Sequence, residues 1–140
     1  MTSPPPDAPP GESEGAERPL VLIVDDNEKN LKLARDLLRA DGFRTLEAAT
    51  GAAGIALATE HLPDLILMDL RLPDIDGADV TRTLGERART ARIPIVGLSS
   101  VPLGESDWFL AAGFAGYLEK PISVAEFAGQ VRRYCGGHRR

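Results

Sequence analysis

The fold is decided by one stretch, residues 63–77, which reads PDLILMDLRLPDIDG. It opens at Pro63 and places four apolar residues, Leu65 to Met68, directly before Asp69. A short apolar run bounded by turn residues is typical of a β-strand buried on both faces. Ligands of open parallel sheets collect at the carboxyl ends of the strands. We therefore interpret Asp69 as a candidate site residue, while a solvated loop aspartate is the alternative that this stretch alone leaves open.

Composition limits the class of protein. The chain has 140 residues, room for one ordinary domain, and a hydrophobic fraction of 43% supports a sizeable core. The net charge of −5 argues against nucleic acid or an anionic membrane as partner, because both require a basic surface. No apolar run approaches the roughly 20 residues that cross a bilayer, and the amino terminus does not resemble a secretory signal. The one cysteine, Cys135, fits a reducing compartment. We expect a cytoplasmic protein.

The ordered domain is predicted to span residues 19–135. Residues 1–18 hold five prolines among Gly, Ser and Glu, so we expect a disordered tail, with a proline-rich docking peptide as the alternative. Residues 136–140 are expected to form a flexible tail. Nothing follows Arg140, so we expect no attached output domain; a fragment of a longer protein is the alternative.

Apolar runs alternate with segments of helical periodicity along the domain. Strands are predicted at 20–24, 43–48, 65–68, 93–98 and 115–118. The first helix is capped by Asp26 or Asn27 and stopped by Gly42. Further helices are predicted at 52–60, 78–86 and 106–112, and a last one from the capping box at 123–126, with an apolar stripe of Val124, Phe127, Ala128 and Val131. This order predicts an α/β fold: a doubly wound, five-stranded parallel sheet with five helices on its two faces.

Polar side chains follow the predicted strands at one edge of the sheet. They are Asp25, Asp26, Asp69, Ser99 and Lys120. Clustered carboxylates either raise a pKa or bind a cation, and hard oxygen ligands suit Mg²⁺. With a hydroxyl and an ammonium opposite, the set favours a phosphoryl group attacked by a carboxylate. No histidine or thiol lies near these strand ends, which disfavours acyl-transfer triads and zinc sites.

Four segments, in order, give the chain a resemblance to the receiver domain of two-component response regulators, from about Leu20 to Tyr134. They are VDDN at 24–27, LMDLRLPDIDG at 67–77, IPIVGLS at 93–99 and GYLEKP at 116–121. The resemblance implies a flavodoxin-like strand order, 2-1-3-4-5. It also implies a single-domain, phosphorylation-dependent signalling switch rather than an enzyme. Its partners would be a histidine kinase or histidine phosphotransfer protein and a downstream effector protein, and the chain would be a monomer or weak dimer.

The resemblance also implies a role for each site residue. Asp69 would accept the phosphoryl group and would also be one of the metal ligands. Mg²⁺, for which Mn²⁺ would substitute, would bind Asp26 directly. Asp25 would assist, often through water, and the main-chain carbonyl of Arg71 would complete the protein ligands. Lys120 would pair with the phosphoryl oxygens.

A second group of residues would couple phosphorylation to a change of shape. Ser99 would move toward the phosphoryl group, and Tyr117 would turn into the vacated space and alter a protein-binding face. The Lys120–Pro121 peptide bond would be cis. Taken singly, these residues have plainer interpretations: Ser99 as a loop cap, Tyr117 as a half-buried strand aromatic and Lys120 as a surface lysine.

Some positions depart from the family pattern or stand outside it. Ser99 replaces a more frequent threonine, Ser100 stands where alanine is usual, and the loop after Ser99 is about one residue short. Arg71 lies at a position thought to influence phosphoryl lifetime in related domains. We interpret Asp74 and Asp76 as loop formers only, and the aromatic residues Trp108, Phe109 and Phe114 as core or partner-facing packing.

Three alternatives remain open from the sequence. A phosphatase of the haloacid-dehalogenase kind would require a second aspartate two residues after the nucleophile, where Arg71 stands. A flavodoxin-like cofactor binder would require a phosphate loop after the first strand, where acidic residues stand. A degenerate receiver is disfavoured by the complete set Asp26, Asp69, Ser99 and Lys120.

Overall fold

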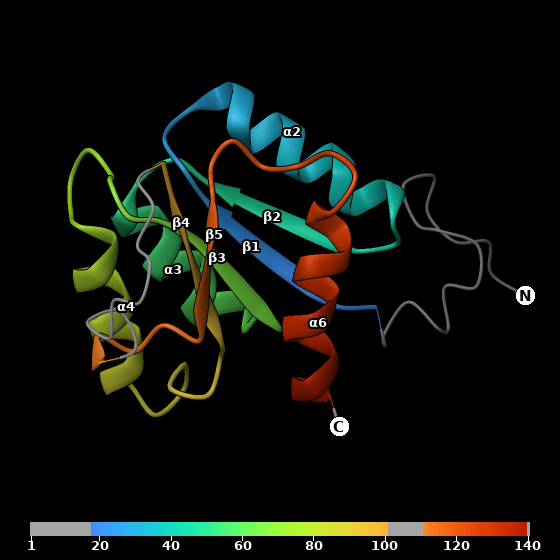
Figure 1. The fold of residues 1–140 in the computed structure, drawn as a ribbon. Coiled ribbons are helices and arrows are strands. Elements are labelled where there is room, and N and C mark those ends of the chain that lie inside the picture. The colour runs from blue at the N-terminus through green and yellow to red at the C-terminus, as the bar shows by residue number, and fades with distance from the viewer. Residues whose placement is uncertain (1–17, 101–110, 140) are drawn as a thin grey trace, which may run out of the picture.

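The computed structural model describes residues 18–100 and 111–139, and its centre is a five-stranded parallel sheet (Figure 1). The strands are β1 (Leu20–Val24), β2 (Arg44–Ala48), β3 (Leu65–Asp69), β4 (Ile95–Ser99) and β5 (Gly116–Glu119). Their order is β2-β1-β3-β4-β5, which confirms the predicted fold class and strand order. All four pairings are parallel, so every strand delivers its carboxyl end to the same edge.

Helices cover both faces of the sheet. They are α2 (Glu28–Ala40), α3 (Gly51–His61), α4 (Gly77–Glu86) and α6 (Phe127–Arg139). Helices α2 and α6 pack on one face and α3 and α4 on the other (Figure 1). The helix predicted at 106–112 and the tail predicted at 1–18 fall almost wholly outside the described residues.

The strand side chains alternate between two cores, as the period of a β-strand requires. In β3, Leu65 and Leu67 face α2 and α6, whereas Ile66 and Met68 face α3 and α4. All four are fully buried, which explains why the sequence of this strand is apolar without interruption. Asp69 is the first residue of the strand that is not apolar, and it marks the edge at which both cores end.

The start and end of α2 agree with the sequence-based prediction. Asn27 is the N-cap, and its side-chain oxygen accepts from the Asn30 N–H at 3.0 Å. Beyond the helix, Gly42 has a φ of +96°, and the Phe43 N–H donates to the carbonyl of Leu38 at 3.0 Å. This is a Schellman ending, in which glycine enters the left-handed region without a Cβ penalty.

The last helix differs from its prediction. Ser123 does accept from the Glu126 N–H, at 3.3 Å, but residues 124–126 form a turn and the helix begins only at Phe127. Val124 is therefore 66% exposed and does not belong to the buried stripe. At its other end α6 continues to Arg139, through residues that the sequence placed in a flexible tail after 135. Within the described residues, no helix is both long and apolar enough to span a membrane.

Candidate functional site

A cleft of about 520 Å³ opens at the carboxyl edge of the sheet, where β1, β3, β4 and β5 end. It brings together most of the side chains that the sequence singled out. Its lining residues are Asp25, Asp26, Asn27, Asn30, Asp69, Leu70, Arg71, Leu98, Ser99, Ser100 and Lys120. The convergence predicted from the parallel topology is therefore present in the structure.

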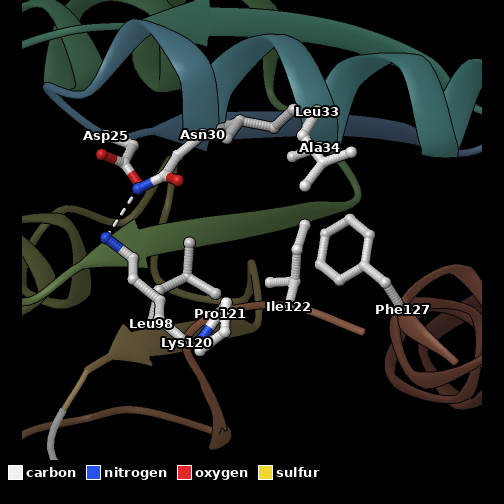
Figure 2. Close-up of a pocket in the computed structure, with 10 residues that line it drawn as sticks. Asp25, Asn30, Leu33, Ala34, Leu98, Lys120, Pro121, Ile122 and Phe127 are labelled. Carbon is white, nitrogen blue, oxygen red and sulfur yellow. Dashed lines mark hydrogen bonds and ion pairs between the residues drawn. The ribbon is translucent and has the colours of Figure 1, made fainter. Parts of the chain in front are cut away.

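Lys120 bridges two of the carboxylates. Its Nζ lies 2.9 Å from Oδ2 of Asp25 and 3.3 Å from Oδ2 of Asp69 (Figure 2 shows the first of these contacts). Burial of the ammonium opposes its charged form, but the two carboxylates outweigh that effect and raise the pKa of Lys120. Lys120 is thus a fixed positive charge inside the cleft and not a solvated surface lysine.

Asp69 is held by its neighbours on both carboxylate oxygens. Oδ1 accepts from the backbone N–H of Arg71 at 3.1 Å, while Oδ2 faces Lys120. The side chain is buried, and that burial, with repulsion from Asp25, raises its pKa against the opposing effects of Arg71 and Lys120. The carboxylate is therefore less stable in its charged form than an exposed aspartate would be.

Three carboxylates form a group of hard oxygen donors. Ligand oxygens of Asp25, Asp26 and Asp69 all lie within 4.8 Å of one another. Asp26 is exposed, while Asp25 and Asp69 are buried. Oxygen ligands with one side open to water are the donor set that Mg²⁺ prefers, so the residues present fit a magnesium ion.

The other predicted site residues occupy the same edge. Ser99 is buried at the end of β4, and its carbonyl accepts from the Lys120 N–H at 2.7 Å. The Lys120–Pro121 peptide bond is cis, as the resemblance implied. Tyr117 is half-buried on β5 and packs against the core on the α3 and α4 side. The conformational-switch roles of Ser99 and Tyr117 stay predictions, and so does metal binding by the Arg71 carbonyl.

Glycine at position 77 brings the loop after β3 close to the site. A Cβ added there would lie 2.3 Å from the carbonyl oxygen of Asp69 and 2.9 Å from the Cα of Leu70. The Gly77 N–H also donates to the carbonyl of Leu70 at 3.2 Å. The loop thus folds back onto the backbone of the candidate acceptor, and only glycine permits that approach.

Two residues at this edge were not predicted from the sequence as part of it. Asp74, interpreted as a loop former, accepts from the N–H groups of Gly51 and Ala52 at 2.8 and 3.0 Å and so caps α3 from a distant loop. Asn30, not singled out at all, donates from its side-chain amide to Asp25 at 3.4 Å. The bonding partners of Asp74 and Asn30 are brought to them by the tertiary fold and not by the local sequence. For Asn30, the one available signal was that a polar residue stands in the first turn of α2, next to the buried Leu31.

The chain is similar to known proteins. A family model described as the response regulator receiver domain matches residues 21–132. The polar-differentiation response regulator DivK of Brucella ovis is 39% identical over 117 residues, which cover 83% of this chain and 95% of that protein.

Two solved structures extend the comparison. One is the receiver domain of the sensor histidine kinase PA1611 from Pseudomonas aeruginosa PAO1, described with a magnesium ion coordinated in its active site cleft. It is 33% identical, with a TM-score of 0.76, and the match covers 85% of this chain and 98% of that one. A putative response regulator from Chloroflexus aurantiacus J-10-fl is 27% identical, with a TM-score of 0.78 and the same two coverages. With its fold, its acidic cleft and these matches, the chain belongs to the response regulator receiver domain family of two-component signalling.

Proposed function

We propose that this domain accepts a phosphoryl group on Asp69 from a phosphohistidine and thereby switches a protein-binding face. The observation that carries the proposal is the Lys120 bridge, which places an ammonium between two buried carboxylates in an open cleft. Phosphorylation on aspartate is typical of the family to which the chain belongs. The proposed phosphoryl donor is a histidine kinase or histidine phosphotransfer protein, and the proposed target is an effector protein.

In the proposed transfer, a carboxylate oxygen of Asp69 attacks phosphorus. A P–O bond forms, the P–N bond of the phosphohistidine breaks, and its electron pair returns to the ring nitrogen. A proton on the other ring nitrogen lets the imidazole leave uncharged. The product is an acyl phosphate on Asp69, and Lys120 is near enough to neutralise one of its oxygens.

Asp25, Asp26 and Asp69, with the carbonyl of Arg71, are the residues proposed to hold Mg²⁺. When bound, the ion supplies positive charge against the phosphoryl oxygens. Asp25 and Lys120 remain ion-paired without it, which keeps the buried carboxylate compensated. The Ser99 hydroxyl is proposed to reach the phosphoryl group, and Tyr117 to follow it inward.

Labelling with acetyl phosphate in the presence of Mg²⁺ tests the proposal. One phosphoryl group should be incorporated, and Asp69→Asn should abolish incorporation. Asp76→Asn is the matched control, because that exposed aspartate on the same loop makes no side-chain cap bond and should label as the wild type does. Incorporation by the Asp69→Asn variant would show that the acceptor has been misassigned. A phosphotransfer profile against sensor kinases would identify the donor.

A further inference from the structure

Asn30 shares one carboxylate oxygen with the site lysine. Its side-chain amide lies 3.4 Å from Oδ2 of Asp25, the same oxygen that Lys120 Nζ contacts at 2.9 Å (Figure 2). The other oxygen, Oδ1, accepts from the backbone N–H of Asn27 at 2.9 Å. One neutral and one charged donor therefore converge on Oδ2, while the backbone holds Oδ1.

The burial of Asp25 makes these donors important. Only 1% of its side chain is exposed, so the carboxylate depends on protein donors in place of water. Lys120 is already 3.3 Å from Asp69, and a phosphoryl group there would compete with Asp25 for the ammonium. Whenever Lys120 moves wholly onto the phosphoryl group, Oδ2 of Asp25 loses its charged donor. A buried carboxylate that loses a charged partner is strongly destabilised unless another donor remains.

The start of α2 fixes Asn30 in the required place. Its backbone N–H is bound by the cap residue Asn27, and the next residue, Leu31, is buried in the core. The half-buried side chain of Asn30 directs its amide toward Asp25 and Lys120 and lines a small void of about 40 Å³, which Lys120 also lines (Figure 2). The rest of that void is mainly apolar, with Ile23, Leu33, Ala34, Leu98, Pro121, Ile122 and Phe127 around it. On its other side Lys120 lines the open cleft together with Asp69, and that cleft leaves space for the lysine to move toward a phosphoryl group.

We propose that Asn30 is a positioning residue that holds Oδ2 of Asp25 when Lys120 leaves it for the phosphoryl group. The inference rests on the proposed function and assigns to this residue the maintenance of one carboxylate of the site. Hydrogen bonds from a neighbouring side chain orient metal-binding carboxylates, and their loss commonly lowers metal affinity. The contribution of Asn30 should therefore be small while Lys120 is present and larger once it is gone.

A double-mutant cycle on Mg²⁺ affinity tests this without any phosphoryl transfer. Lys120→Met imitates the departed lysine, because it keeps an unbranched apolar stem and removes the charge. By isothermal titration calorimetry, Asn30→Ala should weaken Mg²⁺ binding by no more than about 2-fold in the wild-type background. In the Lys120→Met background the same change should weaken it by about 5-fold or more.

Two outcomes would overturn the inference. Equal losses in the two backgrounds would mean that Asn30 acts independently of Lys120, and no loss in either would mean that its amide is not needed. Alanine is a better helix former than asparagine, so a lower affinity of Asn30→Ala cannot be ascribed to a weakened α2. Lys29→Ala serves as the control, because it replaces an exposed neighbouring side chain of α2 and keeps both the Asn30 amide and the Asn27 cap, so its effect should not depend on Lys120.

Failure of this inference is distinguishable from failure of the proposed function. If acetyl phosphate does not label Asp69 in the wild type, the proposed function is wrong whatever the Mg²⁺ titrations give. If labelling succeeds and the two backgrounds respond equally to Asn30→Ala, only the role of Asn30 is wrong. Circular dichroism melting of all four proteins in the cycle establishes that each is folded at the temperature of the titrations.

Discussion

Two aspartates lie five residues apart on the segment that follows β3, and their surroundings act on them in opposite directions. Asp69 is buried beside Asp25, and burial raises its pKa. Asp74 is exposed and accepts from the N–H groups of Gly51 and Ala52, which lower its pKa. The same side chain is thus made less stable as an anion at one position and more stable at the other.

The two environments suit two different roles, a reactive carboxylate at Asp69 and a structural one at Asp74. A carboxylate that is to receive a phosphoryl group must be held in a partly dehydrated cleft near other acids, where its charge is unfavourable. Asp74 instead uses its charge at the amino end of a helix, where it is favourable, and ties the loop after β3 to α3. The segment after β3 therefore begins at Asp69, whose charged form is disfavoured, and continues to Asp74, whose charged form stabilises the fold.

The largest change in stability is expected from Gly77→Ala, because the added Cβ would push Gly77 away from the backbone of Asp69 and Leu70. The added Cβ would meet the Asp69 carbonyl oxygen at 2.3 Å, and backbone atoms cannot move aside as a flexible side chain can. We expect a loss of about 3 kcal/mol or more in the free energy of unfolding, measured in urea, together with slower labelling of Asp69.

Gly85→Ala in the same helix is the control for Gly77→Ala. Apart from its chain neighbours and the backbone of its own helix, no atom of the described residues lies within 4 Å of a Cβ at Gly85, so alanine should stabilise α4 by about 0.5–1 kcal/mol through its helix propensity. A Gly77→Ala variant that is as stable as the wild type would show that the loop does not depend on this close approach.

Asp74→Ala should have a smaller effect, because it removes a cap and leaves the loop backbone free of clashes. We expect the melting temperature to fall by a few degrees at neutral pH. The folded-state pKa of Asp74 is lowered, so its contribution is present above the ordinary aspartate pKa and is lost as the pH falls through the lowered value. Wild type and variant should accordingly converge in acid.

Asp76→Ala provides the comparison on the neighbouring helix. Asp76 is the N-cap residue of α4 but makes no side-chain cap hydrogen bond, so its removal should change the melting temperature much less. Equal losses for the two variants would mean that the negative charge of the loop matters, and that the bonds from Asp74 to α3 do not.

Local sequence signals predicted most of this fold but not the second aspartate. The apolar run before Asp69 and the glycine at 42 act through neighbours a few residues away, and both predictions are confirmed. Asp74 caps a helix that begins 23 residues earlier, and capping rules that look three residues ahead cannot detect such a partner. The same limit explains Asn30, whose acceptor, Asp25, directly follows β1 and does not belong to the helix. Val124 is a different case, because the capping bond at Ser123 is present but residues 124–126 form a turn and the helix begins only at Phe127.

Asp69→Asn is expected to act in the opposite direction to Gly77→Ala and Asp74→Ala, because it should stabilise the unphosphorylated domain. The folded-state pKa of Asp69 lies above that of the unfolded chain, so between these values the native state binds more protons, and stability falls as pH rises through this window. Above this window the deficit is complete, and replacing the carboxylate by an amide should raise the free energy of unfolding in urea at pH 7. Below the ordinary pKa of aspartate the two proteins should have similar stability.

Mg²⁺ should reduce the difference in stability at pH 7. An ion that binds the native wild type stabilises it, and it should stabilise Asp69→Asn less because that variant has lost one of the carboxylate ligands. A variant that is less stable than the wild type at pH 7 without Mg²⁺ would show that the Lys120 ion pair outweighs burial and repulsion, and that both aspartates of this segment stabilise the fold.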